Sequence, residues 1–295
     1  MSGSERQIVA WRADRPVVIA GPTASGKSAL ALAIAEAQGR VIVNADALQV
    51  WACWRVLSAR PTADDEARAP HLLFGHLHPG QDYSVGHWLR EVAGLLAQHP
   101  NPVIVGGTGL YLTALTEGLA DIPPTPAAIR AEADARLARE GAAGMLGELD
   151  PETRARIDPL NPVRIQRAWE VLRATGRGLA GWQAATGPAL LPEGNATLLR
   201  IDAGRDWLAD LIDRRFEAMI DDGALEEVRA ILPLWNPAAP WAKAIGAPEL
   251  VAYMKGVLPL PDAISLAKAA SRQYAKRQRT WLRRRMAHWQ AVPRP

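Results

Sequence analysis

Short, largely apolar runs that alternate with helical patterns dominate the first part of the chain. The runs cover residues 17–20, 41–44, 103–105 and, much later, 197–202. Apolar runs of this length without polar alternation are typical of parallel strands that are buried on both faces. Apolar residues at helical spacing predict helices over residues 29–38, 85–98, 206–222 and 262–286. Strands that alternate with helices predict an α/β core built on a parallel sheet.

The pattern changes after residue 120. Ile122-Pro123-Pro124-Thr125-Pro126 predicts a stiff linker, and short helical patterns rich in Ala, Arg and Glu continue to about residue 187. None of these patterns is an apolar run that would extend the sheet. We therefore predict a mainly helical insertion at residues 121–192, between the two parts of the α/β core at residues 1–120 and 193–295.

A phosphate-binding motif lies between the first predicted strand and the first predicted helix. The motif G-x-x-x-x-G-K-S/T is matched by Gly21, Pro22, Thr23, Ala24, Ser25, Gly26, Lys27 and Ser28. The glycines let backbone N–H groups surround a phosphate, and Lys27 adds a positive charge. Ser28 offers a hydroxyl to a phosphate-bound Mg²⁺. The sequence thus predicts a P-loop, for which ATP is the default ligand.

Two further strand ends are expected at the same site. Asp46 follows the second apolar run, and Gly106-Gly107-Thr108 follows the third. In a doubly wound sheet the carboxyl ends of the strands meet at the ligand crevice. A carboxylate repels phosphate, so Asp46 is expected either to hold Mg²⁺ or to act as a base.

The glycines occupy the position where a usual P-loop nucleotidase has a metal-binding aspartate. They indicate a close approach of a ligand to the backbone, with the Thr108 hydroxyl beside it at the start of the following helix. The alternative is a tight turn between strand and helix.

Composition narrows the class of protein. The 295 residues include one cysteine, Cys53, which excludes an internal disulfide and suits a reducing cytoplasm. No uncharged apolar run approaches the roughly 20 residues of a membrane span. Residues 1–15 carry three arginines and lack the apolar core of a signal peptide. We expect a cytoplasmic protein without a membrane partner.

The last predicted helix is strongly basic, although the net charge of the chain is only +3. No acidic residue follows Asp262. Spacings of three and four residues place on one helix face Lys268, Arg272, Lys276, Arg279 and Arg283. Tyr274 and Trp281 are interleaved and could stack on bases. This pattern indicates a polyanionic partner such as RNA, and a solvated charged face is the alternative.

Together these segments resemble one family, the bacterial tRNA dimethylallyltransferases, also called tRNA isopentenyltransferases. The family's G-P-T-A-S-G-K-S/T and V-G-G-T-G-L-Y motifs are matched in full at residues 21–28 and 105–111. Its D-S-x-Q-V-Y, G-T-A-K-P, D-P-N-D/N-x-x-R and R-Q-Y-A-K-R-Q-x-T-W segments are similar to residues 46–51, 57–61, 158–164 and 272–281. The resemblance extends in order from residue 17 to about residue 289.

The resemblance implies a reaction. A dimethylallyl group would pass from dimethylallyl diphosphate to N6 of the adenosine 3′ of the anticodon, in tRNAs that read codons beginning with U. Asp46 would take the proton from N6, and Lys27, Thr108 and Arg215 would stabilise the departing diphosphate, with Ser28 and Mg²⁺. Arg215 matches the family arginine that precedes an M-x-x-x-G segment, here 219–223.

We expect a monomer, and the resemblance implies a set of tRNA contacts, since the adenine must flip out of the anticodon loop to react. These contacts are Asp46, Ala47, Leu48, Gln49, Thr108, Arg130, Val163, Arg164, Ile165, Gln166, Arg167, Lys243, Ala244, Ile245, Gly246, Ala247, Pro248, Lys276, Arg277, Gln278, Arg279, Thr280, Trp281, Leu282 and Arg283.

The chain departs from the family pattern at a few positions. Ala47 replaces a serine, and Pro248 stands where the family commonly has a lysine or arginine. Trp51 and Ser58 keep the chemical type of the tyrosine and threonine that they replace. We expect weaker or differently selective tRNA binding at residues 245–248.

Three other functions remain open at this point. A small-molecule P-loop kinase would use Asp46 on a hydroxyl proton, but it leaves the basic helix unexplained. An RNA-binding protein with a nucleotide-sensing loop would gain nothing from Asp46. An adenylate isopentenyltransferase shares the loop chemistry, yet it has no need of the basic helix.

Overall fold

The structure, a computed structural model, describes residues 13–294. The N-terminal segment for which we expect no signal peptide therefore lies mostly outside the described residues. The described chain forms two compact units. The first contains the described residues up to Thr116 and from Leu191 onward, and the second is Glu117–Leu190.

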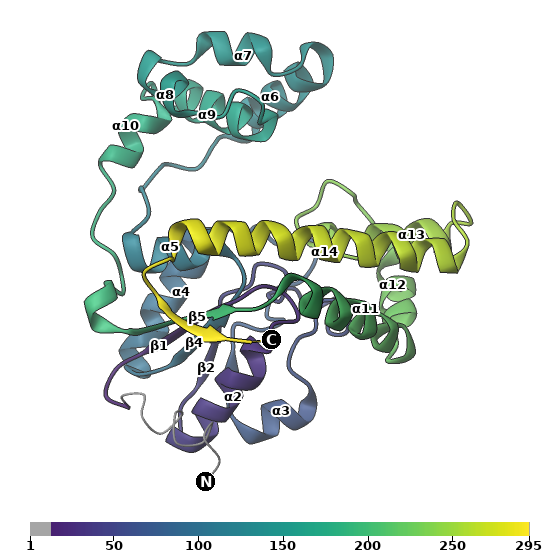
Figure 1. The fold of residues 1–295 in the computed structure, drawn as a ribbon. Helices are drawn as coiled ribbons and strands as arrows, with labels where there is room; N and C mark the ends of the chain where they lie inside the picture. The colour runs from purple at the N-terminus through teal and green to yellow at the C-terminus, as the bar shows by residue number, and fades with distance from the viewer. Residues whose placement is uncertain (1–12, 295) are drawn as a thin grey trace. The chain divides into compact units, whose positions relative to one another are not determined.

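The first unit is built on a six-stranded sheet in the order β3-β2-β4-β1-β5-β6, with every neighbouring pair parallel (Figure 1). The strands are β1 (Val17–Ala20), β2 (Ile42–Asn44), β3 (His71–Leu72), β4 (Val103–Gly106), β5 (Thr197–Asp202) and β6 (Gln290–Pro293). The predicted α/β fold with a parallel sheet is confirmed. The four predicted strands are β1, β2, β4 and β5.

Helices cover both faces of this sheet. The helices of this unit are α2 (Lys27–Gln38), α3 (Ala63–Arg68), α4 (Val85–Gln98), α5 (Gly109–Glu117), α11 (Arg205–Asp221), α12 (Ala224–Ile231), α13 (Ala247–Met254) and α14 (Leu260–Arg285). Side chains of α2 pack with Val17, Ile19 and Val105, while α4 and α5 lie on the opposite face (Figure 1). Right-handed crossovers require this arrangement, because the chain moves in one direction across the sheet from β1 to β3 and in the other from β3 to β5.

The order of the strands places β1 at the centre of the sheet. Val17–Ala20 pairs with β4 on one side and with β5 on the other, and all four of its side chains are buried. The loop after β1 therefore emerges between two neighbouring strands, at the carboxyl edge where ligands bind in folds of this class.

A second core lies beside the sheet and is rich in tryptophan. Trp51 and Trp54 pack with Trp241 and with α11, α12, α13 and α14. The indole N–H of Trp54 donates to the backbone carbonyl of Trp241 over 2.8 Å. Figure 1 shows α14 running from α13 at one end to α5 at the other. This core fixes the helices α11 and α14 above the carboxyl edge of the sheet.

The second unit is helical throughout. Its helices are α6 (Ala127–Glu140), α7 (Ala143–Glu148), α8 (Pro151–Arg156), α9 (Pro162–Thr175) and α10 (Leu179–Ala184). It has its own core, in which Met145, Ile165 and Trp169 are buried. The predicted boundaries at residues 121 and 192 lie close to those of this unit.

Some helices and strands are not predicted by the pattern of apolar residues. β6, α3 and α12 have no counterpart among the predicted elements, whereas β3 lies in residues 69–80, for which the sequence predicts a loop with a short strand. β6 has one buried side chain, that of Val292, and it pairs with β5 only after α14 has crossed the sheet. Within the described residues no helix is both long enough and apolar enough to span a bilayer.

Replacement of Gly106 should destabilise the fold. A Cβ at this position would lie 2.0 Å from the carbonyl oxygen of Ala45, so β4 and the end of β2 would have to separate. We expect Gly106→Ala to lower the free energy of unfolding by about 1–3 kcal/mol in a urea titration. The matched control is Gly94→Ala in α4, where nothing lies within 4 Å and a gain of about 0.5–1 kcal/mol is expected. Equal stability of the two variants would contradict this account.

Candidate active site

The phosphate-binding motif forms a compact loop at the amino end of α2. Ala24 and Gly26 have left-handed backbone conformations, with φ of 61° and 78°. Gly26 is the N-cap of α2 and has no side chain to occupy the first N–H groups of the helix. Those groups point to the carboxyl edge of the sheet, where the helix dipole favours an anion.

Lys27 is buried at the base of this loop. Its Nζ donates to the carbonyl of Pro22 over 3.4 Å. Burial lowers the pKa of Lys27 from 10.5 to about 8; the carboxylate of Asp46 opposes this shift and the guanidinium of Arg215 adds to it. Burial also lowers the pKa of Arg215, again opposed by Asp46. Lys27, Asp46 and Arg215 therefore form one electrostatic centre, and a bound anion would relieve the repulsion between the two cations.

Asp46 is buried and lies in a turn that several bonds hold in place. The Oδ1 of Asn44 accepts from the N–H of Asp46 over 2.8 Å, and the Oδ1 of Asp46 accepts from the N–H of Leu48 over 3.0 Å. Thr108 accepts from the N–H of Ala47 through its Oγ1 over 2.9 Å. Thr108 thus contacts the turn of Asp46, and this contact fixes the orientation of the carboxylate.

The glycines after β4 serve the packing of the chain on itself. A Cβ at Gly107 would lie 2.3 Å from the Nε2 of Gln278, and one at Gly109 would lie 2.5 Å from the ring of Trp281. Together with Gly106, they let the end of β4 touch both the end of β2 and α14. Contacts within the protein thus account for these glycines, and the approach of a ligand to this backbone stays a prediction.

Gln278 joins α14 to the phosphate-binding loop. Its Oε1 accepts from the N–H of Thr23 over 2.8 Å, and its Nε2 donates to the carbonyl of Gly107 over 3.0 Å. The side chain is 6% exposed. Gln278 was expected among the tRNA contacts, but its amide is engaged inside the protein. Gln278 therefore ties α14 both to the phosphate-binding loop and to the end of β4.

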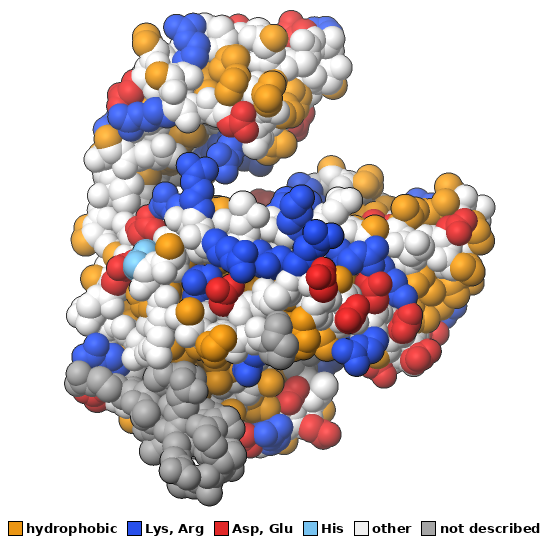
Figure 2. Space-filling view, in the orientation of Figure 1, with side chains coloured by type: hydrophobic (Ala, Val, Ile, Leu, Met, Phe, Trp, Pro, Cys, Tyr) orange, Lys and Arg blue, Asp and Glu red, His pale blue; other side chains and the backbone are white. Residues whose placement is uncertain are grey.

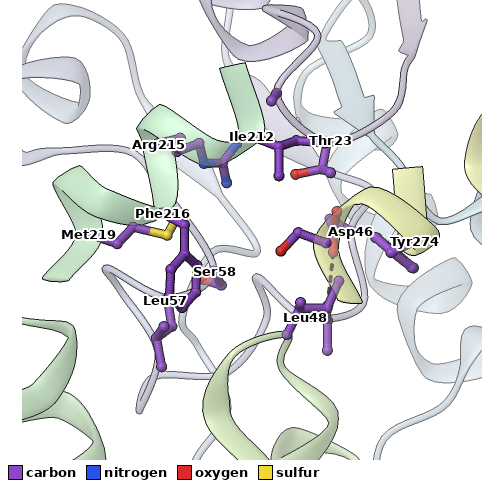
Figure 3. Close-up of a pocket in the computed structure, with 13 residues that line it drawn as sticks. Thr23, Asp46, Leu48, Leu57, Ser58, Ile212, Arg215, Phe216, Met219 and Tyr274 are labelled. Atoms are coloured by element: carbon purple, nitrogen blue, oxygen red, sulfur yellow. Dashed lines mark hydrogen bonds between the residues drawn. The ribbon is translucent and has the colours of Figure 1, made fainter. Parts of the chain in front are cut away.

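Asp46 opens onto a small cavity of about 60 Å³ (Figure 3). The lining is Thr23, Ala24, Asp46, Leu48, Leu57, Ser58, Ile212, Arg215, Phe216, Met219, Ile245, Ser271 and Tyr274. Figure 3 shows Asp46 and Tyr274 on one side, opposite Phe216, Met219 and Leu57. Burial, together with Asp46, raises the pKa of Tyr274, so its hydroxyl keeps its proton. One wall of the cavity is apolar, whereas Thr23, Ser271 and Tyr274 add polar groups beside the charged centre.

A larger groove of about 720 Å³ adjoins this cavity. It is lined by the loop from Ala24 to Ser28, by α11, including Arg215, and by Arg55, Val56, Ala59, Arg60, Thr62 and Ala63. Arg55 and Arg60 add positive charge to it. Because Ala24, Arg215 and Met219 line both spaces, an anion on the loop would sit beside whatever occupies the small cavity.

The basic helix α14 differs from its expected form. No acidic residue follows Asp262 in this helix, but the fold brings three acidic side chains to it. Lys268 pairs with Glu217, Arg272 with Asp213 and Arg283 with Asp202. Lys276 and Arg277 are exposed, and in the described part of the chain no ion pair joins them to an acidic side chain. Figure 2 shows the band of basic side chains along α14 with acidic ones beside it. Lys276 and Arg277 are therefore positive charges of α14 that a polyanion could contact.

Many of the expected tRNA contacts lie on the surface, and others are enclosed. Lys243, Pro248, Arg130, Val163 and Arg164 are exposed. The buried ones are Asp46, Gln49, Ile165, Gln166, Ala244, Gly246, Ala247, Gln278 and Leu282. In the second unit Arg130 and Arg167 both pair with the buried carboxylate of Glu170, at 3.6 and 3.5 Å. Direct contacts with RNA would fall to the exposed members of each segment.

Part of the cavity wall consists of residues that the sequence did not mark as site residues. Ile212, Phe216 and Met219 line it at successive turns of α11, and their spacing of three and four residues predicted only an amphipathic helix. Leu57 comes from an irregular loop without any periodic signal. Cys53 is half-buried, and burial raises the pKa of its thiol to about 11, which fits a packed residue rather than a nucleophile.

The depressed pKa of Lys27 gives a testable pH dependence. With a pKa of about 8, Lys27 is half protonated at pH 8, and a bound anion favours the charged form. We expect the binding of metal-free inorganic diphosphate to be accompanied by the uptake of about half a proton more in the wild type than in Lys27→Arg, because the guanidinium of arginine does not titrate in this range. Calorimetry at pH 8 in buffers of different ionisation heat measures the difference. Equal uptake in both proteins would exclude a depressed pKa at Lys27.

Comparisons with known proteins agree with this geometry. The family model described as IPP transferase matches residues 49–285, and the one described as Isopentenyl transferase matches residues 15–69. A tRNA dimethylallyltransferase of Cereibacter sphaeroides (strain KD131 / KCTC 12085) is 65% identical over 282 residues, covering 96% of this chain and 90% of the relative. One of Paracoccus denitrificans is 60% identical over 285 residues, covering 94% of each chain.

Solved structures show the same relationship. The tRNA isopentenylpyrophosphate transferase of Bacillus halodurans is 29% identical with a TM-score of 0.67, covering 95% of this chain and 90% of that one. A eukaryotic dimethylallyltransferase acting on tRNA has a TM-score of 0.81 at 22% identity, covering 94% of this chain and 73% of that one, and shows the fold alone. With the phosphate-binding loop, Asp46 and Arg215 gathered at one cavity, this chain belongs to the tRNA dimethylallyltransferase family.

Proposed function

We propose that the protein transfers a dimethylallyl group from dimethylallyl diphosphate to N6 of the adenosine 3′ of the anticodon, in tRNAs that read codons beginning with U. The observation that carries the proposal is the shared cavity. Asp46 faces a small space that has an apolar wall of Leu57, Phe216 and Met219 and opens beside the phosphate-binding loop and Arg215. A base, an anion site and an apolar wall are the three features that this reaction needs.

The diphosphate would lie on the loop in the larger groove. Backbone N–H groups of the loop, Lys27 and Arg215 would stabilise the charge that grows on the leaving group. Ser28 is exposed in this groove, and Mg²⁺ commonly keeps several waters and binds through one protein oxygen and substrate phosphates, so the residues present fit this ion. When bound, Mg²⁺ would neutralise phosphate charge.

The five-carbon group would occupy the cavity beside Asp46. In the reaction N6 of adenine forms a bond to C1 of the allyl group, the bond from C1 to the diphosphate oxygen breaks, and the N6 proton passes to the carboxylate of Asp46. Diphosphate leaves with the electron pair. Thr108 and Asn44 act by holding the turn that carries Asp46.

The basic surface accounts for an RNA acceptor rather than a free nucleotide. Lys276 and Arg277 are exposed on α14, and the same helix holds the phosphate-binding loop through Gln278. Lys243 is exposed beside Ile245, which lines the cavity. An adenine flipped out of the anticodon loop could thus reach Asp46 while phosphates rest on these cations.

A direct assay tests this function. The protein is incubated with Mg²⁺, dimethylallyl diphosphate and either an anticodon stem-loop or AMP, and the nucleosides are analysed by mass. We expect the stem-loop to be modified and AMP to stay unchanged. Modification of AMP alone would assign the protein to adenylate prenylation, and transfer to neither acceptor would overturn the proposal.

Asp46→Asn should separate chemistry from binding. The amide keeps the shape of the side chain and an acceptor for the Leu48 N–H, but it cannot take the N6 proton. We expect kcat to fall at least about 100-fold while the Kd for tRNA stays within about twofold. Asp64→Asn, at an exposed carboxylate of α3, is the control and should keep normal turnover. Near-normal turnover of Asp46→Asn would rule out the base role.

Pro248→Arg should strengthen tRNA binding. Pro248 is exposed in the first turn of α13, at a position where the family commonly has a basic residue. A new phosphate contact should lower the Kd for tRNA roughly threefold at low salt, with a smaller gain at high salt. Pro248→Ala removes the ring without adding charge and is the control. Unchanged affinity in the arginine variant would mean that residue 248 does not face the RNA.

A further inference from the structure

A carboxylate outside the charged centre holds one wall of the small cavity. Glu227, in α12, accepts from three consecutive backbone N–H groups. Its Oε1 accepts from Arg55 over 2.6 Å and from Val56 over 2.7 Å, and its Oε2 accepts from Leu57 over 3.0 Å. Charge-assisted bonds of this kind are stronger than bonds between neutral groups. One side chain thus fixes the path of a whole loop.

The loop held by Glu227 needs this support. Ala59 has a left-handed backbone with φ of 49°, which is unfavourable for a residue with a Cβ. Gln49 donates through Nε2 to the carbonyls of Ser58 and Ala59, each over 2.8 Å. These two bonds hold the far end of the loop, and Glu227 holds its beginning. Without either support, the strained residue would relax and the loop would change its path.

The same loop separates the two spaces of the site. Leu57 and Ser58 line the small cavity beside Asp46, whereas Arg55, Val56 and Ala59 line the larger groove. The facing wall comes from α11, through Ile212, Phe216 and Met219. α12 follows α11 directly after Gly223, so Glu227 ties the loop to the pair of helices that forms the opposite wall. Its bonds therefore set the width of the cavity.

The size of the cavity matches a short chain. The cavity measures about 60 Å³, against about 720 Å³ for the adjoining groove. It therefore suits a short chain such as a five-carbon group, and a ten-carbon chain would require the walls to separate. Because Leu57 is 5% exposed and packs in the tryptophan-rich core, it can move away only if its backbone moves.

We propose that Glu227 is a positioning residue that sets the width of the isoprenoid cavity and thereby selects a five-carbon donor over longer allylic diphosphates. The inference rests on the proposed function, because it assigns the isoprenoid group to this cavity. Glu227 touches neither the donor nor the acceptor and acts through the backbone of Leu57.

Glu227→Gln offers a sharp test, since only one of its two terminal atoms can accept. With the carbonyl oxygen kept towards Arg55 and Val56, an NH₂ group faces the N–H of Leu57, and two donors oppose each other at the cavity wall. Glu226→Gln is the matched control. Glu226 is the adjacent residue, it is exposed, and it pairs with Arg229 rather than with the loop.

The measurement is the ratio of kcat/KM for geranyl diphosphate to kcat/KM for dimethylallyl diphosphate, with one anticodon stem-loop as acceptor. This ratio does not depend on how much of a variant is active. We expect it to rise at least about fivefold in Glu227→Gln and to stay at the wild-type value in Glu226→Gln. An unchanged ratio in Glu227→Gln overturns the inference. If the wild type modifies the stem-loop, the proposed function stands whatever the ratio shows.

Leu57→Ala provides the second variant, because it widens the same wall without touching Glu227. It should raise the ratio too, and the double variant should raise it by less than the product of the two single effects. If Glu227→Gln does not fold, Glu227→Asp, which retains the charge but reaches less far, carries the same expectation. Independent, fully multiplicative effects would show that Glu227 does not act through Leu57, and would overturn the inference.

Discussion

The site depends on one constraint, the close approach of protein backbones at the carboxyl edge of the sheet. At Gly106 the end of β4 lies against Ala45, and at Gly107 it lies against the side chain of Gln278. Only residues without a side chain fit there. This approach brings the turn of Asp46 beside the phosphate-binding loop, and it lets α14 reach the loop through a single amide. A wider spacing would separate the base from the anion site.

The electrostatics of the site favour the binding of an anion. Lys27 is buried and shares its surroundings with Arg215, so its pKa falls to about 8. The unfolded chain binds the proton of Lys27 more tightly, and stability therefore rises with pH between about 8 and 10.5 as this cost is lifted. At neutral pH the charged Lys27 is a destabilising feature of the free protein. A bound diphosphate would turn the same charge into a source of affinity, as preorganised sites require.

Positions of charge along α14 illustrate the limits of a one-dimensional pattern. The sequence shows a run of basic residues after Asp262 without any acidic partner, which indicates RNA. In the fold, Asp202 and two carboxylates of α11 pair with three members of that run. The inner face of the helix holds α11 and the loop, whereas its outer face keeps Lys276 and Arg277 in solvent. Spacing identifies a face, but it cannot tell which face another helix will cover.

The sequence by itself determined the parallel α/β core, the phosphate-binding loop and the family, because these depend on local signals: buried apolar strands, glycines at fixed spacing and a contiguous motif. Asp46 was also found, since it directly follows a strand. Only the tertiary structure decided that Gln278 supports the loop, that Glu227 holds the cavity wall and that β6 forms one edge of the sheet. Each of these rests on contacts between residues far apart in the chain, where one side chain meets the backbone of another segment. Periodicity and composition cannot predict such contacts, because their interaction energy exists only once the segments are packed together.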